Sequence, residues 1–116
     1  MANQTINSDA GTVTAKSVKT GPGTVHAALV TNIGASLRWF QLHNKASIPL
    51  ATEVPLLWFP IPAGTAAEPG VLVLSSAWLA PNQEHTVGIG WAISSTPSTF
   101  TDAATANEHT VQVRVT

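Results

Sequence analysis

The chain has 116 residues and contains no cysteine, few charges and no long apolar run. The absence of cysteine excludes a disulfide framework, a thiolate metal site and a thiol nucleophile. Without about 18 consecutive apolar residues, no segment is long enough to cross a membrane as a helix. The polar start, MANQTINSDAG, has neither the charged nor the apolar region of a signal peptide. We therefore expect the protein to be made and folded in a cytoplasm, with no membrane partner.

Charged residues make up only 9% of the chain and the net charge is −1, whereas about 25% is usual for a soluble domain. The five basic residues are scattered, and because phosphate binding requires a basic patch, no nucleic-acid partner is expected. A weakly charged surface favours association. One hypothesis is that part of this surface is buried against copies of the chain or another protein. The alternative is that Thr, Ser, Asn and Ala solvate it.

Two apolar runs, Leu37–Leu42 and Pro55–Pro62, form the centre of the sequence and are joined by a polar connector. Short runs rich in aromatic residues and bounded by Pro and Gly predict buried strands rather than helices. Pro60 and Pro62 exclude a helix in the second run, since each removes a donor and clashes with the preceding turn. They also predict that this strand lies at a sheet edge or leaves the ladder early.

Turn signals separate further short segments whose apolar residues alternate or run continuously. These segments are Thr12–Val18, Thr24–Ile33, Val71–Leu74, Thr86–Ile93 and His109–Val115. Together with the central pair they predict an all-β fold, an antiparallel β-sandwich or jelly-roll-like domain of about seven or eight short strands. We expect one domain over residues 11–116, preceded by a flexible N-terminal arm over Met1–Ala10, which has no periodicity.

The segment Thr86–Ile93 has the clearest alternation in the chain. Its apolar face consists of Val87, Ile89, Trp91 and Ile93, and we expect this face to belong to the core. The other face contains Gly88 and Gly90, whose missing side chains let another backbone or layer approach closely. Gly88 and Gly90 are therefore candidates for an interaction surface.

The four histidines do not form a local chelating pair, because none lies two or four residues from another. They are His26, His43, His85 and His109. We expect ordinary surface histidines, with no metal and no other cofactor; a metal site assembled in space is the alternative.

Two adjacent acid–histidine pairs, Glu84-His85 and Glu108-His109, resemble catalytic dyads. Adjacent side chains of an extended chain point to opposite faces, so we expect each pair to flank the beginning of a strand instead. The sequence has no Gly-x-Ser-x-Gly elbow, phosphate-binding glycine loop or dinucleotide fingerprint. We therefore expect no enzymatic activity and no catalytic residues. The alternative is a small hydrolase whose His/acid site is assembled only by the fold.

Four of the seven aromatic residues are tryptophans. Trp91 is in phase with three aliphatic residues and is expected in the core. Trp58 and Trp78 adjoin a Pro-rich segment and a loop, so they are the candidates for an exposed indole. Such an indole can stack on a sugar ring or anchor a protein contact.

The chain resembles small structural proteins of tailed bacteriophages over roughly Val25 to Val115. In these proteins a strand of the Arg-aromatic-x-Gln-Leu kind leads through an Asn-x-Ala turn to an Ile-Pro-x-Gly strand, and a later glycine-led strand precedes a Thr/Ala-rich loop and a final valine strand. The matching segments are Leu37–Leu42 (LRWFQL), Asn44–Ala46 (NKA), Pro55, Ile61–Gly64 (IPAG), Gly88–Ser95 (GIGWAISS) and Thr96-Pro97. The chain differs in the additional Pro49 of the connector and in the insertion that contains Trp78.

The resemblance implies a non-catalytic virion component, most simply a capsid decoration or cement protein. Its expected partners are the major capsid protein or other virion subunits and further copies of itself, with a trimer favoured. Its location would be the virion, after assembly in the host bacterial cytoplasm. The two differences leave open whether it belongs to the head or the tail. The alternative from another class is a carbohydrate-binding or host-adhesion module of a tail or head fibre, with Trp58 or Trp78 as the sugar platform.

Overall fold

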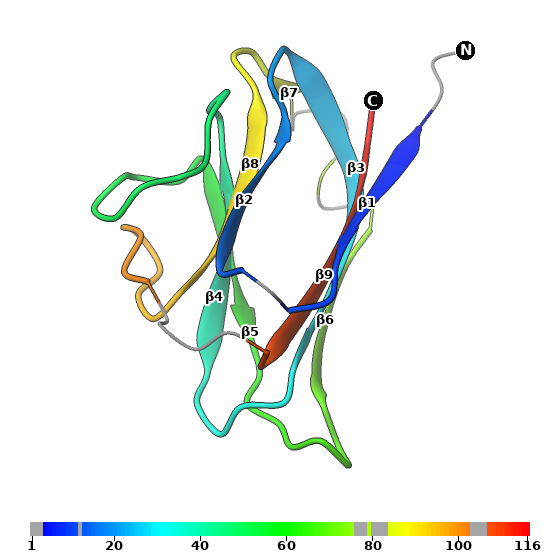
Figure 1. Cartoon of the computed structure of the whole chain (residues 1–116), viewed down its shortest axis with the longest axis vertical. Helices are drawn as coiled ribbons and strands as arrows, with labels where there is room; N and C mark the ends of the chain where they lie inside the picture. The colour runs from blue at the N-terminus through cyan, green and yellow to red at the C-terminus, as the bar shows by residue number, and fades with distance from the viewer. Residues whose placement is uncertain (1–3, 12, 76–78, 80–83, 103–106) are drawn as a thin grey trace.

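The computed structural model describes residues 4–11, 13–75, 79, 84–102 and 107–116, and the protein is all-β. Two antiparallel sheets pack face to face as a β-sandwich, which confirms the predicted fold class (Figure 1). The strands of the described residues are β1 (Thr5–Asp9), β2 (Ala15–Lys19), β3 (Gly23–Asn32), β4 (Arg38–His43), β5 (Leu57–Ile61), β6 (Gly70–Leu74), the two-residue β7 (Glu84–His85), β8 (Ile89–Ser94) and β9 (His109–Val115). Within these residues no helix has the length and apolar character needed to cross a bilayer.

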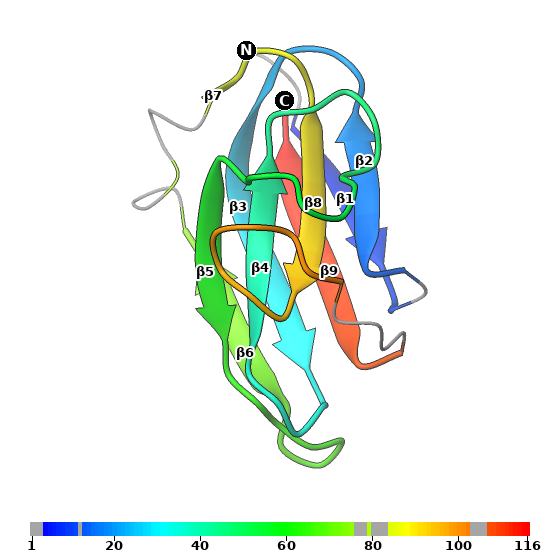
Figure 2. The ribbon, with the colours of Figure 1, turned by 90° about the vertical axis from the view of Figure 1, so that its left-hand side faces the viewer.

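The strand order identifies the sandwich as a jelly roll. One sheet, sheet A, has the order β1-β9-β3-β6, with β7 added to β3, and sheet B has the order β2-β8-β4-β5 (Figure 2). The pairs β1–β9, β2–β8, β3–β6 and β4–β5 are nested, as in one long antiparallel hairpin. The additional pairs β9–β3 and β8–β4 roll this hairpin into two sheets. Such a double-sheet arrangement of eight main strands is characteristic of jelly rolls.

The core lies between the two sheets. The two central apolar runs form neighbouring strands, as predicted. β4 pairs with β5, and Trp39 stands opposite Pro60 in their register. β5 is an edge strand of sheet B, as its prolines predicted. Trp91 is 1% exposed and its ring centroid lies 6.5 Å from that of Phe40. The tilted pair buries large apolar area and adds an aromatic contact at the centre of the sandwich.

A β-bulge changes the phase of β3. The register with β9 shifts between Val25 and Ala27, so one extra residue enters β3 at this point. As a result Val25, Ala28 and Val30 are buried, whereas Leu29 is exposed on the outer face of sheet A. A strict alternation along Thr24–Ile33 would have placed Leu29 on the same side as Val25.

The expected core face of Thr86–Ile93 is correct for Ile89, Trp91 and Ile93 but wrong for Val87, which is exposed. β8 begins only at Ile89. The backbone N–H of Val87 donates to Oδ1 of Asn44 at 2.9 Å. This bond belongs to the loop before the strand, so Val87 is outside the alternation.

The segment expected to be a flexible arm contributes a strand. Thr5–Asp9 forms β1, which pairs with β9 in a five-residue antiparallel register from Thr5↔Val115 to Asp9↔Val111. The side chain of Ile6 is exposed. Backbone pairing with the edge of β9, rather than burial of an apolar face, is therefore what orders this segment, and sequence periodicity does not record such pairing.

The connector between β4 and β5 folds back over the outer face of sheet B. A Cβ atom on Gly88 would lie 2.6 Å from Cα of Ala46 and from the carbonyl oxygen of Lys45, and one on Gly90 would lie 3.1 Å from the Pro49 ring. The close approach that the two glycines predicted is thus made by the chain's own connector.

This packing predicts that Gly88→Ala destabilises the protein by about 1–3 kcal/mol, because the new methyl group collides with backbone that has no rotamer to change. Gly21→Ala is the matched control, since a Cβ on Gly21 meets nothing within 4 Å, and we expect a change of about 0.5 kcal/mol or less. The measurement is the free energy of unfolding in urea. Equal stability of the two variants would contradict the packing described.

Candidate functional site

An apolar stripe runs along the outer side of the β5 edge. From Val54 to Pro62 exposed and less exposed residues alternate, and every exposed member is apolar. The stripe consists of Val54, Leu56, Trp58, Pro60 and Pro62, with exposed fractions of 70% for Val54 and 44% for both Leu56 and Trp58. Scattered exposed aliphatic residues are ordinary, but a contiguous row centred on an indole is a feature of contact surfaces.

The alternation arises because the other side of the same strand faces the core. Ile61 is fully buried, and Leu57 and Phe59 pack against the core cluster. With one face fixed inward, the period of two forces Trp58 outward. The exposure predicted for Trp58 is therefore confirmed.

The neighbouring part of sheet B is covered by the loop of residues 95–101, which crosses in front of β4 and β8 (orange in Figure 2). Gln41, the register partner of Trp58, is fully buried beneath this loop. Its Nε2 donates to the carbonyl oxygens of Thr96, Pro97 and Thr99 at 2.9–3.0 Å. These bonds give the loop carbonyls a buried donor, which holds the loop down on the sheet.

The connector and this loop are also joined to each other. The backbone N–H of Thr52 donates to the carbonyl of Phe100, and the N–H of Phe100 donates to the carbonyl of Glu53, both at 2.8 Å. Thr52 has a φ of 74°, an unfavourable conformation for a β-branched residue. These bonds hold it there. The two loops thus form one fixed cover, and the apolar stripe lies beside it on the edge strand.

The four residues predicted as an interaction surface have different surroundings. Trp58 is exposed within the stripe, whereas Gly88 and Gly90 are buried under the connector. Trp78 lies outside the described residues. The structure therefore does not bring the tryptophan and the glycines together on one open surface.

The expectation of ordinary surface histidines is wrong for three of the four. His43, His85 and His109 are each at most 3% exposed, whereas the half-buried His26 has its Nε2 2.9 Å from Oγ1 of Thr116. The two acid–histidine pairs do flank strand beginnings, as predicted: Glu84 begins β7, and His109 begins β9. Among the described residues, no three His, Asp or Glu side chains lie close enough to hold a metal ion.

His43 is held neutral by its surroundings. Its Nε2 lies 3.0 Å from Oε1 of Gln41, and since the Gln41 amide group already donates to three carbonyls, Nε2 of His43 carries the hydrogen that Oε1 accepts. The Phe100 ring packs edge-on against the imidazole. Burial lowers the pKa of His43 from 6.5 to about 4, against an opposing effect of the Glu53 carboxylate.

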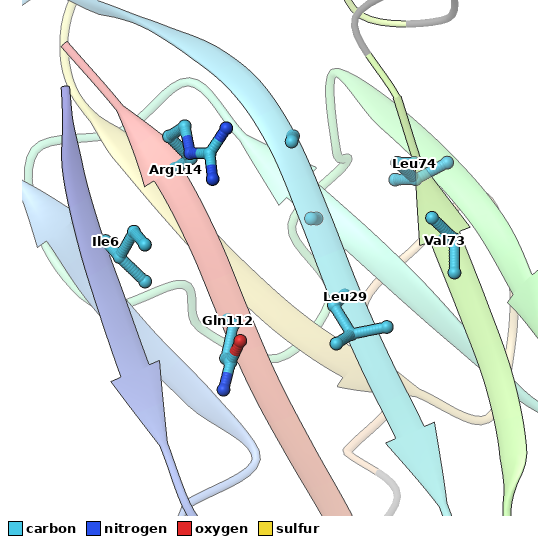
Figure 3. Close-up of a pocket in the computed structure, with 8 residues that line it drawn as sticks. Ile6, Leu29, Val73, Leu74, Gln112 and Arg114 are labelled. Atoms are coloured by element: carbon cyan, nitrogen blue, oxygen red, sulfur yellow. The ribbon is translucent and has the colours of Figure 1, made fainter.

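A second exposed apolar region lies on the outer face of sheet A. A shallow hollow of about 380 Å³ crosses all four main strands there, from Ile6 on β1 to Val73 on β6 (Figure 3). Leu29 lies in the middle because the β3 bulge turns it outward, and Gln112 and Arg114 supply the polar groups. The outward direction of Gln112 and Arg114 follows from the valine alternation of β9, but nothing in the sequence marks the bulge.

No protein-family model, curated protein sequence or solved structure matches the chain.

The environment of His43 predicts a loss of stability in acid. The unfolded chain protonates near pH 6.5, whereas the folded chain does so only near pH 4. The unfolded state therefore takes up the proton first as the pH falls, and the free energy of unfolding decreases between pH 7 and pH 4 by about 3 kcal/mol from this residue. We expect His43→Gln to flatten the curve over this window in urea titrations.

The variant also loses packing and a hydrogen bond. This loss lowers the free energy of unfolding by the same amount at every pH, so any change in slope comes from removal of the titrating imidazole. Part of the slope remains in the variant, because burial also lowers the pKa of His109. Parallel curves for the wild type and His43→Gln would contradict the assignment to His43.

Proposed function

We propose that the chain is a non-catalytic structural protein of a tailed-bacteriophage virion, most simply a capsid decoration or cement protein that binds the particle surface as an oligomer. The observation that carries the proposal is an almost uncharged jelly roll with exposed apolar rows on both outer faces. Contiguous exposed apolar rows are a feature of protein contact sites.

The apolar stripe suits contact with a coat protein. Its centre is an indole, a side chain enriched among the residues that dominate binding energy, and its other members are apolar, as in the buried core of interfaces. The adjoining cover is fixed by hydrogen bonds to Gln41 and between its own two loops. Binding on such a rigid surface costs little ordering entropy.

The fold adds a weaker argument. Jelly rolls recur in viral capsid domains and in lectins. Because one fold serves many functions, this is an analogy and not a derivation. It agrees with the resemblance of the central segments to phage structural proteins, which rests on residue pattern alone.

The proposal predicts that the chain sediments with capsids assembled from a coat protein encoded beside it. Leu56→Lys places a charge in the stripe, and we expect it to weaken capsid binding by about tenfold or more. Thr20→Lys, at an exposed position outside the stripe, is the matched control and should bind like the wild type. Because the stripe is uncharged, binding should change little between about 0.05 and 0.5 M salt.

Failure of the wild-type chain to sediment with capsids at micromolar concentration would contradict the proposal. Equal binding by Leu56→Lys and Thr20→Lys would contradict the role of the stripe.

A carbohydrate-binding or host-adhesion module is the second candidate, and the exposed indole of Trp58 favours it. Aromatic side chains offer a flat apolar face with a polar edge, which suits a sugar ring. The flanking Leu56 and Pro60 have no hydrogen-bonding side chains, whereas sugar hydroxyl groups require polar partners. This composition favours the protein contact over the sugar.

A glycan array distinguishes the two candidates. We expect no specific glycan signal for the wild type. Glycan binding that disappears in Trp58→Ala but persists in Leu56→Lys would replace the capsid proposal with the adhesion module.

A further inference from the structure

The two sheets have four edge strands, and three of them carry features that prevent pairing with another chain. β2 has Lys16 and Lys19 and a register shift between Ser17 and Lys19. β5 has Pro60 within the strand. β1 is polar over its last three residues and ends in Asp9. Charges, bulges and proline are the means by which natural β-proteins block edge-to-edge association.

β6 has none of these features. Its sequence is GVLVL, its register with β3 is regular over all five residues, and it contains no charge and no proline. β3 is the one strand in the described part of the protein with which β6 pairs. Val73 is 67% exposed and Val71 is also exposed. An apolar edge of this kind is a template for a further strand.

The flank of the sandwich formed by β5 and β6 is electrically neutral. Neither 54–62 nor 70–74 contains an Asp, Glu, Lys or Arg residue, so two such flanks approach without burying or opposing charges. The opposite flank is charged: Lys19 lies on β2, and Nζ of Lys16 lies 3.9 Å from Oδ2 of Asp9. Pairing two copies of this flank would therefore bury charged groups, which is costly.

We propose that the occupant of this edge is a second copy of the chain, and that two β6 strands pair antiparallel about a twofold axis. An antiparallel edge is complementary to itself under twofold symmetry, so the contact closes with two subunits. The pairing extends sheet A through both molecules and brings Val71 and Val73 of one copy beside the same valines of the other. Glu68 precedes β6. Because the strands are antiparallel, the two copies of Glu68 lie at opposite ends of the contact and do not meet each other.

The size of the contact sets its strength. Two paired five-residue strands span about 17 Å, which places the contact at the small end of specific interfaces. The exposed side chain of Leu29, next to Val73 in the β3–β6 register, extends the apolar area on the outer face. We therefore infer a reversible dimer with a dissociation constant in the micromolar range.

This inference rests on the proposed function in that it assigns the subunit contact of the proposed oligomer, but its test uses the purified chain without capsids. Sedimentation velocity between about 1 and 200 µM should show a dimer. Val73→Lys should raise the dissociation constant about 100-fold, because the twofold axis brings two lysines together. Ile6→Lys, at a 56% exposed position on the other edge of sheet A, is the matched control and should dimerise normally.

Cysteine cross-linking supplies a second measurement that does not depend on weakened association. The natural chain has no cysteine, so Val71→Cys/Val73→Cys introduces the only thiols. Whether the twofold axis passes through position 71, 72 or 73 of the paired strands, a cysteine of one copy lies opposite a cysteine of the other. Under mild oxidation we expect a covalent dimer from this variant and none from Ile6→Cys. Circular dichroism establishes that each variant is folded.

A monomeric wild type, a trimer, or a dimer unaffected by Val73→Lys would overturn the β6 pairing. Capsid binding by a strictly monomeric chain would overturn the β6 pairing and the oligomeric state, while the proposed role as a capsid-binding structural protein would stand. A stable dimer that does not bind capsids would overturn the proposed function while leaving the β6 pairing intact.

Discussion

The structure depends on the burial of β8 from both sides. All six of its residues are buried. Ile89, Trp91 and Ile93 face the core between the sheets, and Gly90 lies under the connector. A central strand buried on one face needs only a second sheet, but burial on both faces requires a third layer. In this protein the chain supplies that layer from its own loops.

This third layer determines which side chains remain outside. The loops bring backbone carbonyls down onto the sheet, and buried carbonyls need donors. The amide group of Gln41 supplies three of these bonds. The polar side chain of Gln41 on this face thus bonds within the molecule. The edge strand β5 lies beside this cover, and its outward side chains are apolar. The apolar character of this exposed strand thus accompanies the use of the polar side chain of Gln41 for buried loop carbonyls.

The sequence predicted the strands well because their signals are local. The range of β9 matches its valine alternation. The prolines of β5 predicted either an edge strand or an early end to its pairing, and β5 is an edge strand. It did not predict contacts between distant segments, such as the pairing of β1 with β9 or the bulge that turns Leu29 outward. It also did not predict the burial of His43 beside Gln41, which bonds to a loop residue 55 positions away. For the candidate site, the aromatic run identified Trp58. The glycines of Thr86–Ile93 predicted a close approach without indicating that the chain itself makes it.

The nested order of the strands also constrains when the protein can fold. β9 lies between β1 and β3 in sheet A, and among the described strands it is synthesised after all of its partners. Until then β1 has no neighbour, and β3 lacks its longest partner. Most pairings join segments far apart in sequence, which makes β-rich folding slow. The nascent chain therefore passes through an interval in which apolar strands lack their partners, and exposed strands of this kind are prone to aggregate.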